Sequence, residues 1–421
     1  MNILWLTQTA LTEARQLMNK KTNPFVGWLE SASAHLADSE GINLSVAFPE
    51  NRLTDVQVIN GNKIKYYVFP PVSEKYDPSR ENVFLKKILN YARPDIVNIF
   101  GSEHAHSLAM VRTCNEQNIP VVLSFQGIIS MCARHYMAYL PARVRNGVTF
   151  GDLIYQGNLR QEQGRFFMRG RSEIEAVRKV RYVIGRTALD RAFTTQINPG
   201  AKYYFCNETL RDEFYKHGWD IDRCEKHSIF ISQAGYPIKG LHLMLEAMPL
   251  ILRRFPDARI YVAGLNIIKS DTLKDKLKLT SYGKYIKALI KRYDLGESVE
   301  FTGILDERQM CRRYLQSHVF VCASSIENSP NSLGEAMILG VPCVASDVGG
   351  VTDLLTHKEE GFVYQADAPY MLAHYVCEVF ANDELAGQFS AKAREHALRT
   401  HDREVNTHTL ISIYNDIRRE A

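Results

Sequence analysis

The stretch ENSPNSLGEAM, residues 327–337, carries Glu327 and, eight positions later, Glu335. Asparagines, serines, a proline and a glycine separate the two carboxylates. The stretch follows the apolar run HVFVCASSI and leads into a segment of helical period that ends at Gly340. We therefore expect a strand, a loop that holds Glu327, a turn at Pro330 and Asn331, and a helix with Glu335 in its first turn.

The expected helix start could bind an anion, because a helix N-terminus presents unpaired N–H groups and roughly half a positive charge. A diphosphate on the amides around Ser332 and Leu333 would leave Glu335 one turn inward, able to accept hydrogen bonds from a ribose. Glu327 would face the group beyond the second phosphate. The pattern predicts a site for a nucleotide diphosphate sugar, although a helix-start glutamate and an exposed loop acid would have the same spacing.

Short apolar runs alternate with longer helical segments along the chain and form two series. We expect these strands and helices to position the residues of the motif. The first series runs from NILWLT to KYYFCN, and the second from SIFISQA to GFVY. Strands separated by helices imply right-handed βαβ units and a parallel sheet covered on both faces. At 421 residues the chain has room for about two domains. We predict an α/β protein with two doubly wound domains, whose ligands bind beyond the carboxyl ends of the strands.

The polar segment 217–227 separates the two series and gives predicted domains at 1–216 and 217–400. A basic helical insertion at about 128–186 is assigned to the first domain. Residues 401–421 have the apolar spacing of an amphipathic helix, which could pack on either domain. We expect this last helix to cross back to the N-terminal domain.

The longer stretch ENSPNSLGEAMILGVPCVASDVGGVTDLL closely resembles the donor-site signature of the retaining family 4 glycosyltransferases, or group 1 glycosyl transferases. The likeness includes YPIKGLHLMLEAM, FTGIL and the final helix, and so covers most of residues 228–418. The resemblance implies the GT-B fold, in which two Rossmann-like domains face each other across a cleft. It also implies a nucleotide-sugar donor and retention of configuration at the anomeric carbon.

The resemblance assigns roles to the residues of the opening motif. Glu335 is implied to bind the ribose, and Glu327 to contact the sugar or its departing phosphate. The backbone at Asn331, Ser332 and Leu333 is implied to receive the diphosphate.

Lys239 is implied to neutralise charge on the leaving phosphates. This is physically reasonable, because PIKG follows the strand SIFIS at the mouth of the same sheet, where a cation can stabilise developing negative charge. The family usually carries an arginine a few residues earlier, and SQAGYPIKG has none. Either Gln233 takes a weaker polar role or another basic residue supplies the second charge. The first domain of the family also commonly ends a strand with a histidine that touches the donor sugar, and VVLSFQGII has Gln126 at the matching place. Gln126 can hydrogen-bond a hydroxyl but cannot act as an acid.

Three further residues are candidates in the first domain. Gly27, in NPFVGWLE, begins a helix where the family often has two glycines, and one glycine lets a backbone approach a phosphate. His104 and His106 follow the strand DIVNIFG and are predicted to contact the acceptor, with a structural or solvent-facing role as the alternative.

A metal-binding DxD is the alternative reading of Asp220 and Asp222 in GWDIDRC. Because this pair lies in the expected boundary segment, we interpret it as part of a solvated linker. We predict no metal and no cofactor, with the diphosphate charge neutralised by backbone amides and Lys239.

Residues 133–186 contain eleven Arg or Lys against four Asp or Glu, interleaved with aromatic and aliphatic residues. Basic amphipathic helices of this kind bind anionic lipid surfaces, so we predict either peripheral membrane contact or a face that packs its apolar side and solvates its arginines. The sequence has no recognisable nucleic-acid-binding motif, and we expect no nucleic-acid partner. It also lacks a signal peptide and a run of ~20 apolar residues, which predicts a cytoplasmic protein with contact at the inner face of the membrane.

We predict transfer of a hexosyl group from a nucleotide diphosphate sugar, with UDP-sugars favoured, to a hydroxyl of a saccharide or lipid-linked saccharide in cell-surface polysaccharide biosynthesis. The alternatives are a non-catalytic nucleotide-sugar binding protein and a GT-B epimerase. A phosphorylase would need a pyridoxal-bearing lysine, which no stretch indicates. A nicotinamide dehydrogenase is disfavoured because no G-x-G-x-x-G follows a predicted strand.

Overall fold

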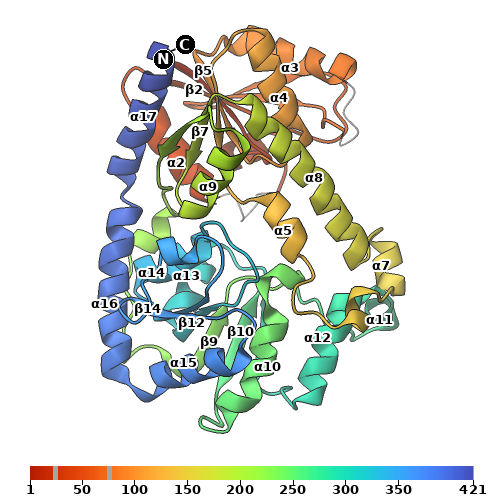
Figure 1. The fold of residues 1–421 in the computed structure, drawn as a ribbon, viewed down its shortest axis with the longest axis vertical. Helices are drawn as coiled ribbons and strands as arrows, with labels where there is room; N and C mark the ends of the chain where they lie inside the picture. The colour runs from red at the N-terminus through yellow and green to blue at the C-terminus, as the bar shows by residue number, and fades with distance from the viewer. Residues whose placement is uncertain (22–26, 74–77, 421) are drawn as a thin grey trace. The chain divides into compact units, whose positions relative to one another are not determined.

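The computed structural model describes residues 1–21, 27–73 and 78–420, and the chain divides into two compact units (Figure 1). The first unit comprises Met1–Ser130, Phe167–Arg211 and Thr400–Ala421. The second comprises Met131–Phe166 and Asp212–Arg399. Ala421 lies outside the described residues.

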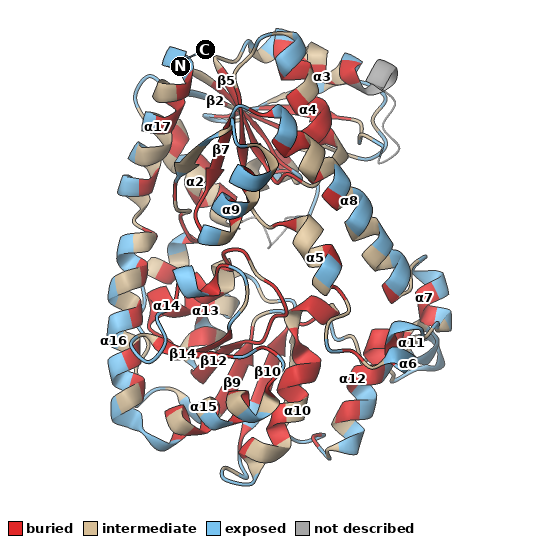
Figure 2. Ribbon diagram, viewed as in Figure 1, coloured by how far each residue is buried: buried red, intermediate tan, exposed pale blue. Residues whose placement is uncertain are grey.

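The first unit is built on a sheet of eight described strands in the order β3-β4-β2-β1-β5-β6-β7-β8. Among these strands β3 pairs antiparallel with β4, and the other pairings are parallel. The central strands are mostly apolar and buried, as expected of a sheet with helices on both faces (Figure 2). The strands are β1 (Asn2–Leu6), β2 (Asn43–Pro49), β3 (Gln57–Asn60), β4 (Lys65–Phe69), β5 (Ile96–Phe100), β6 (Val121–Ser124), β7 (Tyr182–Gly185) and β8 (Lys202–Phe205).

The helices of the first unit follow the strands in sequence. Two of them continue into the second unit: α5 begins in the first unit, and α8 ends there. The helices are α1 (Thr12–Leu17), α2 (Gly27–Ala37), α3 (Pro78–Ala92), α4 (Ala105–Glu116), α5 (Ile129–His135), α8 (Leu159–Lys179), α9 (Ala188–Ile197) and α17 (Arg403–Glu420).

The second unit has a six-stranded parallel sheet in the order β11-β10-β9-β12-β13-β14. Its strands are β9 (Glu225–Ile231), β10 (Arg259–Ala263), β11 (Val299–Gly303), β12 (Ser317–Cys322), β13 (Cys343–Ser346) and β14 (Gly361–Tyr364). Its main helices are α10 (Leu241–Leu252), α11 (Leu273–Lys278), α12 (Ser281–Arg292), α13 (Glu307–Leu315), α14 (Asn331–Leu339), α15 (Pro369–Ala381) and α16 (Asp383–Thr400). The prediction of two α/β units with parallel sheets is confirmed.

The basic insertion differs from its predicted assignment, because its residues 131–166 group with the second unit. Thr149 and Asp152 form a capping box at the start of α7 (Phe150–Ile154). The buried carboxylate of Asp152 also accepts the backbone N–H of Ser281 at 3.1 and 3.2 Å, and Thr149 Oγ1 donates to the carbonyl of Leu279 at 2.7 Å. These bonds join α7 to the start of α12.

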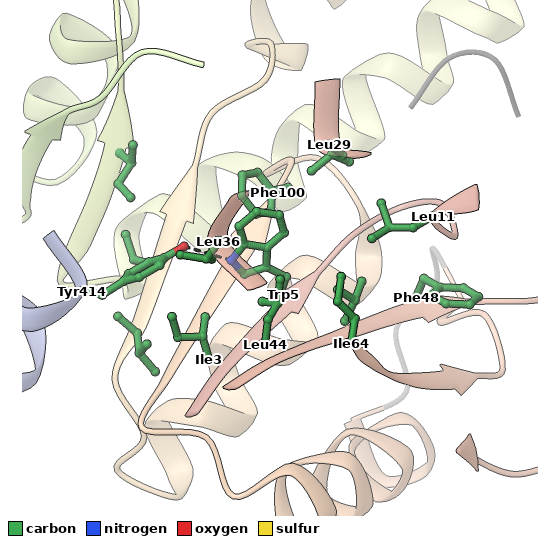
Figure 3. Close-up of a cluster of buried hydrophobic side chains, with 14 of the residues drawn as sticks. Ile3, Trp5, Leu11, Leu29, Leu36, Leu44, Phe48, Ile64, Phe100 and Tyr414 are labelled. Carbon is green, nitrogen blue, oxygen red and sulfur yellow. Dashed lines mark hydrogen bonds between the residues drawn. The ribbon is translucent and has the colours of Figure 1, made fainter. Parts of the chain in front are cut away.

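The last helix, α17, packs in the first unit (Figure 3). Ile413, Tyr414 and Ile417 join a buried cluster that includes residues from β1, β2 and β4. The Tyr414 hydroxyl accepts hydrogen bonds from Trp5 Nε1 at 3.0 Å and Asn98 Nδ2 at 2.6 Å. The helix that was expected to cross back is therefore part of this core.

Among the residues that the structure describes, no helix combines the length and the apolar character needed to cross a membrane.

Candidate active site

The start of α14 lies at the carboxyl edge of the second sheet, after the loop that follows β12. Pro330 occupies the N-cap position, and a proline side chain has no oxygen that could cap the helix. The N–H groups of Leu333 and Gly334 donate to the Pro330 carbonyl at 2.9 and 3.2 Å. The earlier amides of Asn331 and Ser332 lie before the first bond of the helix ladder, so they are the ones suited to an anion. The predicted contribution of the Leu333 N–H to binding the diphosphate is smaller, because this N–H already donates to the Pro330 carbonyl.

The first turn of α14 is held from α13. The hydroxyl of Tyr314, a fully buried side chain, donates to the carbonyl of Ser332 at 2.9 Å. This bond fixes the direction of the peptide that leads into the helix.

Glu335 was expected in the first turn of the helix. It is the fifth residue of α14 and so lies just beyond that turn. The helix begins at Asn331 because Pro330 retains an extended backbone, with φ −71° and ψ 110°. The Glu335 side chain is buried, with 7% of the residue exposed. This carboxylate therefore stands one turn inward from the amides that could receive a phosphate.

Lys239 and Glu327 form a close ion pair. Lys239 Nζ lies 2.5 Å from Glu327 Oε1, and Ser324 Oγ donates to the same oxygen at 2.6 Å. Lys239 follows β9 and Glu327 follows β12, and these two strands are neighbours in the sheet. Their loops meet because parallel strands deliver their carboxyl ends to one edge. Ser324 was not identified from the sequence, because no sequence signal distinguishes it from its neighbour Ser325.

Lys239 is held in its charged form. Burial alone would lower the pKa of this ammonium, but the Glu327 carboxylate outweighs burial, and the net effect is a raised pKa. A permanently charged, largely desolvated cation can stabilise negative charge on a leaving group more strongly than one in water.

Gly240 sets the position of Lys239. Its φ of 70° is left-handed, and a Cβ at this position would lie 1.8 Å from the carbonyl oxygen of Ala323. The same turn is held by the N–H of Ser325, which donates to the Ile238 carbonyl at 2.7 Å. The glycine thus lets the turn after β9 approach the end of β12. The role of Gly240 could not be told from the PIKG motif alone.

Gln233 comes two residues after β9 and is exposed at the same edge of the second sheet. It is therefore accessible to a ligand there, and its predicted polar role stays a prediction.

Gln126 belongs to the first unit, directly beyond β6. Its Nε2 donates to Glu208 Oε1 at 2.6 Å and to the carbonyl of Phe125 at 3.2 Å. Arg186 Nη1 contacts the same Glu208 oxygen at 2.7 Å. The three polar side chains come from the loops after β6, β7 and β8, which are adjacent strands. Arg186 and Glu208 were missed because a position after a strand does not by itself distinguish a largely buried charge from a charge in an exposed loop.

His104 and His106 differ in exposure. His104 precedes α4, and its Nε2 lies 3.0 Å from Glu103 Oε1. The two imidazoles stack at 5.0 Å between ring centroids, and His106 also packs edge-on against Phe69. Burial lowers the pKa of His106 well below its usual value, so its ring is neutral. With 4% of its surface exposed, His106 occupies a packing position, and His104 is the better candidate for ligand contact.

Gly27 is the first residue of α2. A Cβ here would lie 2.3 Å from the Arg211 side chain, which is 8% exposed. The absence of a side chain at Gly27 therefore lets Arg211 pack against the start of α2. The role of Gly27 in binding a phosphate stays a prediction.

A residue that sequence analysis missed, Glu173 on α8, joins two strand-end loops of the first unit. It accepts hydrogen bonds from the N–H groups of Ile129 and Ser130 at 3.0 and 2.9 Å, and from Ser102 Oγ at 2.8 Å. Burial raises the pKa of this carboxyl to about 7, against the opposing effect of these hydrogen bonds.

Asp220 and Asp222 are engaged locally. Asp220 Oδ1 accepts the N–H of Asp222 at 3.0 Å, and its Oδ2 lies 3.4 Å from Arg223 Nε. Across the described part of the chain, no group of three or more His, Cys, Asp or Glu side chains is arranged to hold a metal ion.

Comparison with known sequences finds a family likeness in the second unit. Residues 213–396 match the family model described as Glycosyl transferases group 1. Phosphatidyl-myo-inositol mannosyltransferase from Mycobacterium leprae is 26% identical over 197 residues, which are 46% of this chain and 48% of that protein. The chain spans about half the length of the curated relatives it matches.

Solved structures extend the likeness to both units. Sucrose-phosphate synthase from Thermosynechococcus elongatus has a TM-score of 0.73 at 14% identity, over 100% of this chain and 99% of that chain. Anabaena HepE in complex with UDP-glucose has a TM-score of 0.67 at 15% identity, over 98% of this chain and 99% of that chain. These likenesses establish the fold, which is the GT-B fold with two Rossmann-like units. Residues 213–396, which hold the α14 motif and Lys239, are similar to the group 1 glycosyltransferases.

Proposed function

We propose that the protein is a retaining hexosyltransferase that uses a nucleotide diphosphate sugar, with UDP-sugars favoured. The observation that carries the proposal is the Lys239–Glu327 pair in the unit that holds the uncapped start of α14. The UDP-glucose bound to HepE supports a UDP-sugar donor, and the mannosyltransferase name of the mycobacterial relative supports a hexosyl group.

In this proposal the donor lies along the carboxyl edge of the second sheet. The amides of Asn331 and Ser332 bind the diphosphate, and the Glu335 carboxylate accepts hydrogen bonds from the ribose hydroxyls. Glu327 binds hydroxyls of the sugar. Lys239 already lies beside Glu327, so a phosphate in reach of Glu327 would be in reach of the lysine as well.

In the proposed reaction, the bond between the anomeric carbon and the diphosphate oxygen breaks while a bond to the acceptor oxygen forms on the same face. The acceptor hydroxyl gives its proton to the departing diphosphate. Lys239 stabilises the negative charge that develops on the leaving oxygen, and positioning of the two substrates supplies the rest of the acceleration. Each proton and electron pair is accounted for by the two substrates, so the proposal includes neither metal nor cofactor.

The proposed acceptor is a hydroxyl of a saccharide or lipid-linked saccharide, as in assembly of a cell-surface polysaccharide at the cytoplasmic face of a membrane. His104 is the side chain proposed to contact the acceptor, and Gln126 is proposed to bind a hydroxyl of the donor sugar. Both stand at strand ends of the first sheet. Peripheral contact with anionic lipid is part of this proposal.

A second candidate is a nucleotide-sugar binding protein without transferase activity. It is favoured by Gln126, which cannot act as an acid, and by the segment SQAGYPIKG, which has no arginine. An epimerase on the same fold would convert the donor sugar without needing an acceptor.

The test is release of nucleoside diphosphate from UDP-, GDP- and ADP-sugars, measured with and without saccharide acceptors. We expect turnover in the native protein and in the control Glu359→Ala, an exposed acid of the same unit, and its loss in Glu327→Ala. Donor binding without turnover in the native protein would favour the binding protein, and sugar conversion without transfer would favour the epimerase. A chelator should leave the rate unchanged, and complete loss of activity would contradict metal independence.

A further inference from the structure

Two short helices of the second unit that are far apart in sequence, α7 and α11, lie against each other (Figure 1). A third, α6 (Ala142–Arg145), precedes α7 and contacts α12. We refer to these three helices, with Tyr155, as the α6/α7/α11 surface.

This surface exposes large apolar side chains. Figure 2 colours parts of α7 and α11 as exposed. Leu153 is 65% exposed and Leu273 is 79% exposed. Phe150, Tyr155 and Leu277 are each more than half exposed. Single exposed apolar residues are ordinary, whereas several on adjacent elements mark an interaction site.

The apolar side chains are exposed because α7 is fixed by its polar side. The buried Asp152 carboxylate and the Thr149 hydroxyl bind the backbone at Ser281 and Leu279. Gly151 packs so closely that a Cβ there would lie 2.4 Å from the carbonyl oxygen of Lys278. The helix is thus held inward by hydrogen bonds and backbone packing, with its leucine and aromatic residues left outside.

Basic side chains are interleaved with these apolar ones. The three helices contain five Arg or Lys and two Asp or Glu, and both acids are capping-box residues of their own helices. The exposed cations Lys274 and Lys276 lie between Leu273 and Leu277 along α11. The basic residues are Arg143, Arg145, Lys274, Lys276 and Lys278.

We propose that the α6/α7/α11 surface docks on an anionic lipid bilayer. Apolar side chains that enter the acyl boundary, together with cations at headgroup level, are the combination that holds interfacial helices on such membranes. A protein partner is the weaker fit, because the centres of protein interfaces are depleted in lysine. This proposal deepens the membrane contact proposed above and assigns it to a defined surface. That surface includes α11, which lies outside the basic segment identified from the sequence.

The test is flotation of the full chain with vesicles of phosphatidylcholine, alone or mixed with phosphatidylglycerol. We expect the protein to float with the mixed vesicles, to stay at the bottom with phosphatidylcholine alone, and to bind less as salt is raised. Native protein that stays at the bottom with mixed vesicles would overturn the proposal.

Variants locate the surface. The double change Leu153→Asn with Leu273→Asn should weaken partition at least tenfold, because each leucine contributes apolar burial in the membrane. Lys274→Gln and Lys276→Gln should each weaken it roughly fivefold. Tyr370→Asn is the control, since Tyr370 is 67% exposed on α15 of the same unit. Equal flotation of the double variant and the control would count against this surface.

Two further measurements separate other outcomes. Circular dichroism and thermal shift with UDP-glucose should be unchanged in the double variant, so that loss of vesicle binding cannot be confused with misfolding or with failure of the donor site. Sedimentation velocity without lipid should give the same species for native protein and double variant. A dimer that the double variant abolishes would assign the surface to a second copy of the chain and overturn the lipid proposal.

Discussion

At the scale of single residues, Glu173 is a carboxyl whose ionisation opposes folding. It is fully buried, and its pKa is raised from 4.5 to about 7. The stabilisation that its protonated form provides is complete below about pH 4.5 and is lost as the pH rises through about 7. The difference amounts to about 3 kcal/mol, from 1.36 kcal/mol per unit of pKa.

We therefore predict that Glu173→Gln removes part of the pH dependence of stability. Urea unfolding followed by circular dichroism at pH 5 and pH 8 should show a smaller difference in the free energy of unfolding for the variant than for the native protein. Glu175→Gln is the control, because Glu175 lies on the same helix with 41% of its side chain exposed. An unchanged pH dependence in Glu173→Gln would show that the carboxyl is not the titrating group.

The positions of Glu327 and Lys239 in strand-end loops of the second unit could be predicted, whereas the side chains that contact them and Gln126 could not. Glu327, Glu335 and Lys239 were identified because their types and spacing match a family signature, and strand neighbours explain why Lys239 meets Glu327. Ser324 and Glu208 lack such a pattern, because their contacts depend on loops that the chain brings together only after folding.

At the scale of elements, the turn from Pro237 to Gly240 determines where Lys239 is held. The left-handed φ of Gly240 and the close approach of Ala323 leave no room for a side chain. Gly235 lies in the same loop, and a Cβ there would meet no atom within 4 Å among the described residues.

We predict that Gly240→Ala destabilises the second unit and Gly235→Ala does not. The left-handed conformation alone costs about 1–3 kcal/mol for a residue with a Cβ, and the contact with the Ala323 carbonyl adds to this. Thermal unfolding should give a lower Tm for Gly240→Ala and a value near native for Gly235→Ala. Equal Tm values for the two variants would contradict the role assigned to the turn.

Most strands could be predicted from short apolar runs, because those patterns are local. The strand β3 (Gln57–Asn60) was missed because it is largely exposed and carries no apolar run. The placement of residues 131–166 could not be predicted, since it depends on Asp152 and Thr149 bonding to backbone groups around Ser281, far along the chain. The basic composition of the segment carries no information about which unit receives it. The first-turn assignment of Glu335 was wrong because helix starts depend on the backbone angles of a single residue, here Pro330.

At the scale of the whole molecule, the chain leaves the first unit twice and returns each time, the second time through α17. Tyr414 on α17 is the acceptor for two donors in the core of the first unit, Trp5 Nε1 and Asn98 Nδ2. The return of the chain therefore completes the hydrogen bonding of that core.

We predict that Tyr414→Phe destabilises the first unit, because it leaves both buried donors without their acceptor. The cost is about 1–3 kcal/mol for each unsatisfied group. Urea unfolding followed by tryptophan fluorescence should show the loss. Tyr370→Phe, which removes an exposed hydroxyl, should be neutral. A Tyr414→Phe variant as stable as native would mean that the Tyr414 hydroxyl does not stabilise the first unit.

The central claim is that the start of α14, with Lys239 and Glu335, binds a nucleotide diphosphate sugar. Isothermal titration calorimetry of the native protein with UDP-, GDP- and ADP-sugars measures this binding. We predict saturable binding of one donor per chain, weakened at least tenfold in Lys239→Met and Glu335→Gln and unchanged in Glu384→Gln, an exposed acid of the same unit. Absence of binding to every donor, or equal affinity in all the variants, would contradict it.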